Sequence, residues 1–328
     1  MKIAIISVTE SGKLLANNIN SKLVDDPTII KVEVYHKNVR ETLKGIFQSY
    51  DCIFGIMATG IMVRNCCSLL NNKANDPAIL VIDELGKHVI SLLSGHQGGA
   101  NYIANKIANV IDADPIITTA TDLNNKFGVD SLARKYYFMM DNISNIKNIN
   151  SALLNNERVQ IAFNQKFDYI WEDWEVRNTY DKISKTSDKL IISQGSTQID
   201  LSPQKMVVGI GSRKNISTQS VVKAIKFAMN ILHLSPKRID SIATGYMKQN
   251  EKGIIDAALE LNIPLEIISE KQLKNFNYPD LSESAFVMDN FGVVGVCEPS
   301  ALIAAGDSSI LIFRKTSYNG VTVAIAVF

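Results

Sequence analysis

The sequence of 328 residues predicts an α/β protein with more than one domain. Apolar runs typical of β-strands alternate with helix-like segments from residue 2 to about residue 133, and the same alternation resumes after Pro203. The stretch between them is rich in asparagine and nearly free of glycine, and it contains both tryptophans. We therefore expect a mainly parallel sheet domain at residues 1–133, a small α+β middle domain at 134–204 and a C-terminal α/β domain at 205–328.

The N-terminal domain has the clearest pattern. Strands are predicted at residues 3–8, 32–35, 52–57, 79–82, 88–93 and 116–119, and helices at 12–23, 39–47, 61–70 and 99–110. Because parallel strands bring their carboxyl ends to one edge of a sheet, the turns that follow them should lie together. The turns at residues 7–12, 58–60, 94–96 and 118–122 all carry glycine or small hydroxyl residues. We expect them to form one polar rim around one ligand.

The turn at residues 94–99 carries the strongest local signal. Ser94, Gly95, His96, Gly98 and Gly99 stand between a predicted strand and the helix that begins near residue 100. Glycines let a backbone approach a ligand closely, and a helix N-terminus favours an anion. His96 is the side chain there that exchanges protons near neutral pH. The alternative is that the glycines serve tight packing and that His96 caps the helix.

Charged residues accompany this predicted rim. Arg64 lies one turn into its helix, Lys73 lies in the next loop, and Glu84 follows a strand. Arg64 could instead pair with a surface acid.

The C-terminal domain repeats the pattern of strand, glycine turn and helix. Gly209 and Gly211 end a strand, Arg213 follows them, and Ser217 is expected to cap the next helix. A full dinucleotide fingerprint is absent, so an anion site is predicted there and not an NAD site. Asn319 and Gly320 form a hairpin turn.

Composition excludes several classes of protein. The formal net charge of +1 gives no global attraction to nucleic acid or to an anionic membrane. The four cysteines form no CxxC pair and are expected as buried free thiols, and the histidines have no zinc-like spacing. We therefore expect no protein-bound catalytic metal. Without a signal peptide or an apolar run long enough to span a bilayer, a cytoplasmic location is expected. Trp171 and Trp174 are expected to pack in the middle domain, in preference to stacking on a ligand.

Several motifs occur together in one order. They are Lys73-x-x-Asp76-Pro77, Asp83-Glu84-x-Gly86, the segment 92–101, Thr118-Thr119-Ala120-Thr121-Asp122, Gly209-x-Gly211-x-Arg213, Lys248-x-x-Glu251, Glu298-x-x-Ala301 and the tail 320–326. This set resembles the CbiG family, the cobalt-precorrin-5A hydrolases of anaerobic cobalamin biosynthesis, over nearly the whole chain. Ser212 and Asn215 depart from the family pattern, which usually has cysteine and glycine there. Ser212 argues against an obligatory thiol nucleophile at that turn.

The resemblance implies that a δ-lactone of a cobalt corrinoid is hydrolysed and that acetaldehyde leaves. It implies no cofactor, since cobalt is carried by the substrate. We expect His96 to be the base or acid, with Asp122 or Glu84 orienting it. If the neutral imidazole is the base, the rate should rise through a pKa near 6–7. The expected substrate-binding residues are Ser94, Gly95, Gly98, Gly99, Asn101, Arg64, Lys73, Thr119, Arg213, Lys248 and Glu298.

Two other functions stay open at this point. One is a tetrapyrrole-binding carrier or assembly subunit that performs no turnover. The other is an unrelated nucleotide-binding α/β enzyme, which the missing Walker lysine pattern disfavours. The expected partner is a small corrinoid substrate, with no nucleic acid and no membrane. A homo-oligomer or transient contact with other enzymes of the pathway also stays open.

Overall fold

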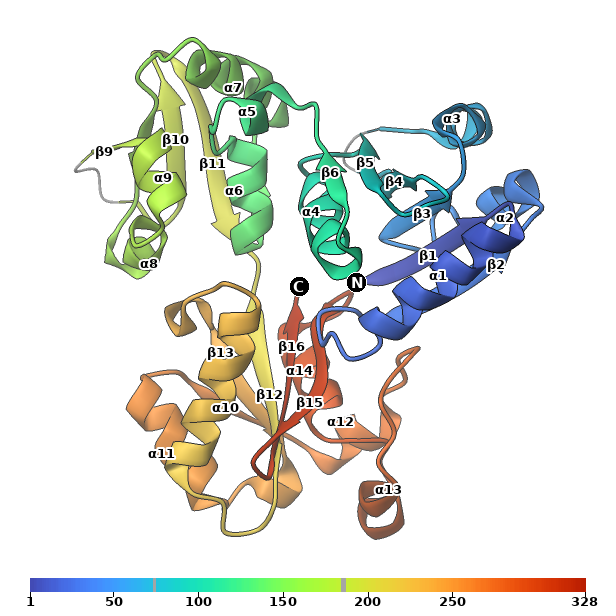
Figure 1. Cartoon of the computed structure of the whole chain (residues 1–328). Coiled ribbons are helices and arrows are strands. Elements are labelled where there is room, and N and C mark those ends of the chain that lie inside the picture. The colour runs from blue at the N-terminus through green and yellow to red at the C-terminus, as the bar shows by residue number, and fades with distance from the viewer. Residues whose placement is uncertain (73–74, 184–186) are drawn as a thin grey trace. The chain divides into compact units, whose positions relative to one another are not determined.

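The computed structural model describes residues 1–72, 75–183 and 187–328. The chain forms two compact units, Met1–Ser202 and Pro203–Phe328. The first unit holds a six-stranded and a five-stranded sheet, and the second unit holds another five-stranded sheet (Figure 1). The predicted α/β class is confirmed. None of the helices described is long and apolar enough to cross a membrane.

The six-stranded sheet has the strand order β2-β1-β3-β4-β5-β6. Strands β1 to β4 are parallel, β5 is antiparallel to β4, and β6 is parallel to β5. The strands are β1 (Lys2–Ser7), β2 (Lys31–His36), β3 (Cys52–Ile56), β4 (Ala78–Ile82), β5 (His88–Leu93) and β6 (Asp114–Ile116).

The antiparallel β4–β5 pair corrects the prediction of a single polar rim. The five residues 83–87 close this hairpin, with Gly86 at φ +69° and the Asp83 carboxylate accepting from the N–H groups of Leu85 and Lys87 at 3.0 Å each. As a result the turns after β1 and β3 lie at one edge of the sheet. The turns after β5 and β6 lie at the opposite edge. The four polar turns therefore do not form one rim.

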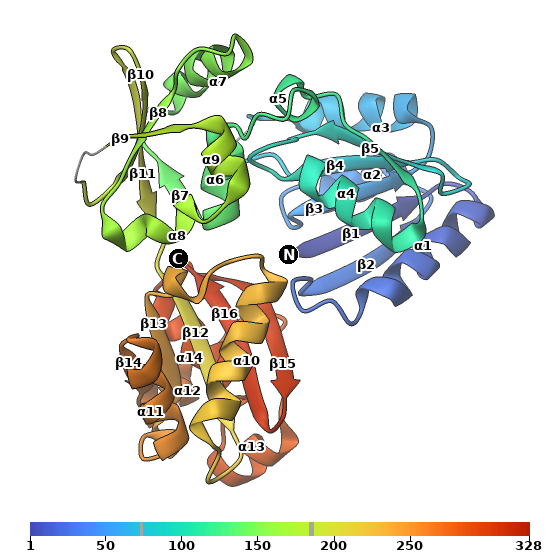
Figure 2. The same ribbon diagram turned by 60° about the vertical axis from the view of Figure 1, so that its left-hand side comes forward.

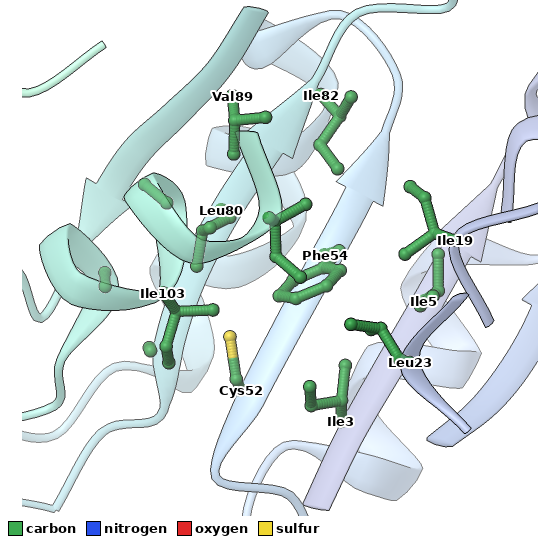
Figure 3. Close-up of a cluster of buried hydrophobic side chains, with 14 of the residues drawn as sticks. Ile3, Ile5, Ile19, Leu23, Cys52, Phe54, Leu80, Ile82, Val89 and Ile103 are labelled. Carbon is green, nitrogen blue, oxygen red and sulfur yellow. The ribbon is translucent and has the colours of Figure 1, made fainter. Parts of the chain in front are cut away.

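Helices cover both faces of this sheet (Figure 2). Helices α1 (Glu10–Leu23) and α4 (Ala100–Ile111) pack on one face, and α2 (Val39–Ile46) and α3 (Thr59–Cys66) pack on the other. Under α1 and α4, Phe54 and Leu80 of the sheet meet Ile19 and Ile103 of the helices (Figure 3). Because the connections after β1 and β3 cross opposite faces, the gap between these two strands is a topological switch point, where ligands of α/β proteins commonly bind.

The middle sheet has the order β7-β11-β10-β8-β9. Trp171 is partly buried beside Phe163, as expected, but Trp174 is 61% exposed, so its predicted packing is wrong. The strands are β7 (Phe138–Met140), β8 (Gln160–Ala162), β9 (Asp181–Ile183), β10 (Leu190–Gln194) and β11 (Thr197–Pro203). The helices from residue 120 to 179 are α5 (Ala120–Leu123), α6 (Val129–Tyr136), α7 (Ile146–Leu154), α8 (Asp168–Trp171) and α9 (Trp174–Thr179).

The second unit has the strand order β14-β13-β12-β16-β15. Asn319 and Gly320 both have positive φ at the β15–β16 turn, as the prediction of an Asn-Gly hairpin requires. The strands are β12 (Met206–Ser212), β13 (Ser241–Gly245), β14 (Leu265–Ile268), β15 (Ile310–Tyr318) and β16 (Val321–Val327). The helices are α10 (Thr218–Ile231), α11 (Lys252–Leu261), α12 (Glu270–Asn275), α13 (Ala285–Phe291) and α14 (Cys297–Ala305).

Close packing explains the Gly-x-Gly sequence in β12. A Cβ atom on Gly209 would overlap the carbonyl of Cys297 in α14, and one on Gly211 would lie 2.5 Å from the Thr322 hydroxyl. These glycines bring α14 and β16 against β12. The cysteines are free thiols, and Cys52, Cys66 and Cys297 are buried as expected, but Cys67 is exposed.

Candidate functional site

A crevice opens at the switch point of the six-stranded sheet. It has a volume of about 250 Å³, and both apolar and polar residues line it. We call it the switch-point crevice. It is lined by Val8, Thr9, Ile56, Met57, Ala58, Thr59, Val81, Asp83, Glu84 and Ile90. Of the residues predicted for catalysis, this crevice contains Glu84.

Glu84 is exposed at the rim and held by one defined contact. The Thr9 hydroxyl donates to Glu84 Oε1 at 2.9 Å, and the same Thr9 oxygen accepts from the N–H of Gly12 at 3.0 Å, which caps helix α1. Helix α3 also begins at the crevice, and its N-cap residue Ala58 has no side chain that could accept a hydrogen bond. The crevice thus places a carboxylate beside the positive ends of two helices, which suits activation of water and stabilisation of an oxyanion.

Arg64 lies one turn further along α3. It is exposed, and its guanidinium Nη1 donates to the carbonyl of Gly60 at 3.3 Å. No carboxylate pairs with it in the part of the chain that the structure describes, so the alternative of a surface ion pair is not realised there. Lys73, the other predicted cation of this region, lies outside the described residues.

The glycine turn lies at the opposite edge of the sheet. Its carbonyls at Ser94 and Gly95 accept from the N–H groups of Ala100 and Asn101 at 3.1 and 3.0 Å, so part of the N-terminus of α4 is satisfied internally. A Cβ on Gly95 would lie 2.8 Å from Oδ1 of Asn101. A Cβ on Gly98 would lie 2.5 Å from the Ser94 Cβ. Tight packing therefore accounts for Gly95 and Gly98.

His96 is held between two carboxylates. Its Nε2 lies 2.8 Å from Asp122 and its Nδ1 lies 2.9 Å from Asp130 on α6. Burial alone would lower the pKa of His96, but the hydrogen bonds to Asp122 and Asp130 outweigh it and raise the pKa to about 9. Burial would raise the pKa of Asp130, and the hydrogen bond from His96 reverses this and lowers it. At neutral pH the imidazole is thus protonated on both nitrogens.

This geometry corrects the expected pKa of 6–7. A carboxylate lies at hydrogen-bond distance from each ring nitrogen of His96, which disfavours a neutral imidazole base; the role of His96 as an acid stays a prediction. Glu84 does not orient His96, since it lies in the crevice at the other edge of the sheet. Asp122, the other predicted partner, does contact it. Helix α4 is preceded by Gly99 and has no side-chain cap, so His96 does not cap it either.

Asn101 extends the network around His96. Its Nδ2 donates to Thr119 Oγ1 at 3.0 Å and to Asp122 at 3.1 Å, while its Oδ1 accepts from Ser91 at 2.6 Å. Asn101 is 5% exposed, so its side chain serves to position those of Thr119 and Asp122. The structure thus brings together four predicted residues, His96, Asn101, Thr119 and Asp122. It adds Asp130, which no motif in the sequence marked.

In the second unit, two of the three predicted residues lie at the carboxyl edge of β12 and β13. Arg213 is exposed beside the β15–β16 turn, where its N–H donates to the carbonyl of Gly320 at 3.0 Å. Lys248 lies 3.5 Å from Glu251, whose other carboxylate oxygen accepts from the N–H of Ile216 at 3.1 Å. This link ties the loop after β12 to the segment after β13.

Glu298 is 1% exposed. Its carboxylate accepts from the N–H and hydroxyl of Ser282, at 2.7 and 3.0 Å, and from the N–H of Lys315 at 2.7 Å. All of these hydrogen bonds join groups within this unit. Glu298 therefore holds the segments around Ser282 and Lys315 to helix α14.

Comparison with known proteins identifies the family. Residues 41–122 match the family model for the N-terminal part of cobalamin synthesis protein G, and residues 206–326 match the model for its C-terminal part. This chain belongs to the CbiG family. A relative from Methanocaldococcus jannaschii, named "Probable cobalt-precorrin-5A hydrolase", is 34% identical over 99% of both chains.

Two further relatives support the assignment to this family. The cobalt-precorrin-5A hydrolase of Salmonella typhimurium is 31% identical over 87% of this chain and 84% of its own. A crystal structure of a cobalamin biosynthesis protein G homologue from Sulfolobus solfataricus has 29% identity and a TM-score of 0.62, and it covers 100% of this chain and 97% of that one. The expected CbiG resemblance is confirmed.

Proposed function

We propose that this CbiG protein is a cobalt-precorrin-5A hydrolase. The observation that carries the proposal is the match to the Methanocaldococcus jannaschii relative, which runs over 99% of both chains. The substrate is a corrinoid that brings its own cobalt, and the reaction needs no cofactor of the protein. The two-carbon fragment freed by lactone opening leaves as acetaldehyde.

The switch-point crevice supports the hydrolytic step. Its volume of about 250 Å³ is below the roughly 300–1,000 Å³ of typical ligand pockets, so it suits the lactone edge of a larger substrate. Glu84 takes a proton from water, whose oxygen attacks the lactone carbonyl. The N–H groups of Thr59 and Gly60 at the start of α3, which meet no acceptor among the described residues, stabilise the oxyanion.

The tetrahedral intermediate then collapses. The bond between the carbonyl carbon and the ring oxygen breaks, and protonated Glu84 returns its proton to the leaving oxygen, which regenerates the carboxylate. In the second step the alcohol loses its proton and its oxygen becomes the aldehyde oxygen. The bond between the alcohol carbon and the macrocycle breaks, and the macrocycle keeps the electron pair and takes up a proton. In this proposal His96 is a positioning residue, because its ring is fixed by Asp122 and Asp130.

Incubation of the purified protein with cobalt-precorrin-5A tests the proposal. We expect stoichiometric acetaldehyde and a corrinoid product lighter by the two-carbon fragment and heavier by water, measured by an aldehyde-coupled assay and by mass spectrometry. Tight binding of the corrinoid without acetaldehyde would instead identify the carrier or assembly subunit. An unchanged corrinoid with no binding would contradict both functions.

A further inference from the structure

Arg134 of helix α6 occupies an unusual position against the glycine turn. Its guanidinium lies directly on the backbone of Gly99, so close that a Cβ on Gly99 would overlap it. The φ angle of Gly99 is +84°, a second reason why this position requires glycine. The guanidinium also lies over the ring of Tyr102, 5.2 Å from its centroid.

Arg134 lacks the acidic partner that comparable cations in this unit have. Lys135, its neighbour in sequence, pairs with Asp173 at 2.6 Å and with Glu175 at 2.8 Å. Lys106 pairs with Asp26. Within the described part of the chain, the guanidinium of Arg134 makes no hydrogen bond and no ion pair; it contacts the ring of Tyr102 and interacts with the Asp51 carboxylate only at longer range.

The surroundings of Arg134 disfavour an unpaired positive charge. Burial lowers its pKa below the usual range for arginine. The charge also stands at the start of helix α4, where the helix dipole is positive. A cation that is poorly solvated and has no ion-pair partner is costly unless an anion joins it.

The turn beside it has further unused donors. The N–H groups of Gly98 and Gly99 meet no acceptor among residues 1–72, 75–183 and 187–328. Gly98 is only half-buried, so a ligand can approach the turn from solvent. A planar guanidinium next to backbone N–H groups matches the two oxygens of a carboxylate.

We propose that Arg134, together with the N–H groups of Gly98 and Gly99, binds a carboxylate of the substrate. The proposal rests on the proposed function, since a peripheral carboxylate of the corrinoid is the anion available there. It assigns to the glycine turn the recognition of a substrate side chain, at the edge of the sheet opposite the switch-point crevice. Arg134 is accordingly a specificity residue for the polycarboxylate substrate.

The variants Arg134→Gln and Arg134→Lys test this subsite in steady-state turnover of cobalt-precorrin-5A. We expect Arg134→Gln to raise KM roughly tenfold or more with little change in kcat, because the carboxylate is bound equally in the ground and transition states. Arg134→Lys should give a smaller rise, since it keeps the charge and loses the planar fork. The matched control is Arg158→Gln, because Arg158 is 84% exposed and paired with Asp181, and it should keep the wild-type KM.

A second measurement does not depend on turnover. Citrate should raise the melting temperature of the wild-type protein above its value in sodium chloride of equal ionic strength, and Arg134→Gln should lose this difference. In citrate-free buffer Arg134→Gln should melt no lower than the wild type, since it removes an unpaired charge. A wild-type KM in Arg134→Gln, or an equal citrate effect in both proteins, would overturn the subsite. Failure of the wild type to turn over the corrinoid would contradict the proposed function, and the citrate comparison would still decide the subsite.

Discussion

Nδ1 of His96 lies 2.9 Å from Oδ2 of Asp130, a residue 34 positions later in the chain. This ion pair joins the glycine turn after β5 to helix α6. The sequence predicts that His96 transfers protons, whereas this ion pair holds the imidazole protonated and in a fixed position.

The first prediction concerns the pH dependence of this link. The pKa of His96 is about 9 in the folded protein and about 6.5 in an unfolded chain, so its contribution to stability is complete below pH 6.5 and is lost as pH rises through 9. We expect the wild type to exceed His96→Asn in free energy of unfolding by about 3 kcal/mol at pH 6, and by much less at pH 9.5. Both tryptophans lie in the first unit, so their fluorescence during urea unfolding reports on it. A difference that grows with pH would contradict the ion pair.

The second prediction separates Glu84 from His96 in catalysis. Glu84→Gln keeps a group that can accept from Thr9 but removes the base, so kcat should fall by about 10²–10⁴ with an unchanged melting temperature. Folded His96→Asn should keep most of the wild-type kcat. Glu41→Gln, which alters an exposed carboxylate paired with Lys44, is the control for loss of a surface charge. The assignment of Glu84 fails if Glu84→Gln turns over at the wild-type rate.

The third prediction concerns Glu298. Glu298→Ala leaves the partly buried N–H groups of Ser282 and Lys315 without their acceptor, which should cost about 2–4 kcal/mol of stability. Hydrogen exchange of the amides in β15 should quicken accordingly, whereas the tryptophan fluorescence of the first unit should not change. The fraction that remains folded should bind the corrinoid with the wild-type KM. A large rise in KM with unaltered exchange would restore Glu298 as a substrate-binding residue.

The fourth prediction compares two glycines. Gly209→Ala places a methyl group on the carbonyl of Cys297 and should destabilise the second unit by about 3 kcal/mol, because neither backbone can yield easily. Gly45→Ala, in helix α2, meets no atom within 4 Å and should be neutral or stabilising by about 0.5–1 kcal/mol. Calorimetry measures the thermal unfolding of both variants, and Gly209→Ala should melt at the lower temperature. Equal melting temperatures would show that β12 and α14 do not approach so closely.

Much of the local structure could be predicted from the sequence because its causes are local. Ser217 caps α10 by accepting from the N–H of Ser220, as its position before an apolar helix pattern predicts. The β4–β5 hairpin could have been predicted too. The five residues between these strands are too few for a parallel crossover, which needs a dozen or more. Because β5 is antiparallel to β4, the glycine turn lies at the edge of the sheet opposite Glu84.

The sequence alone determined the family, the succession of strands and helices and the Asn319–Gly320 turn, since periodicity and turn chemistry act between near neighbours. Only the tertiary structure decided the partners of the charged side chains. Asp130 meets His96 and Arg134 meets Gly99 because α6 packs beside the end of β5, and no spacing in the sequence encodes that contact. The pKa of a histidine and the pairing of an arginine depend on charges and burial within a few ångströms, and these are set by residues far apart along the chain.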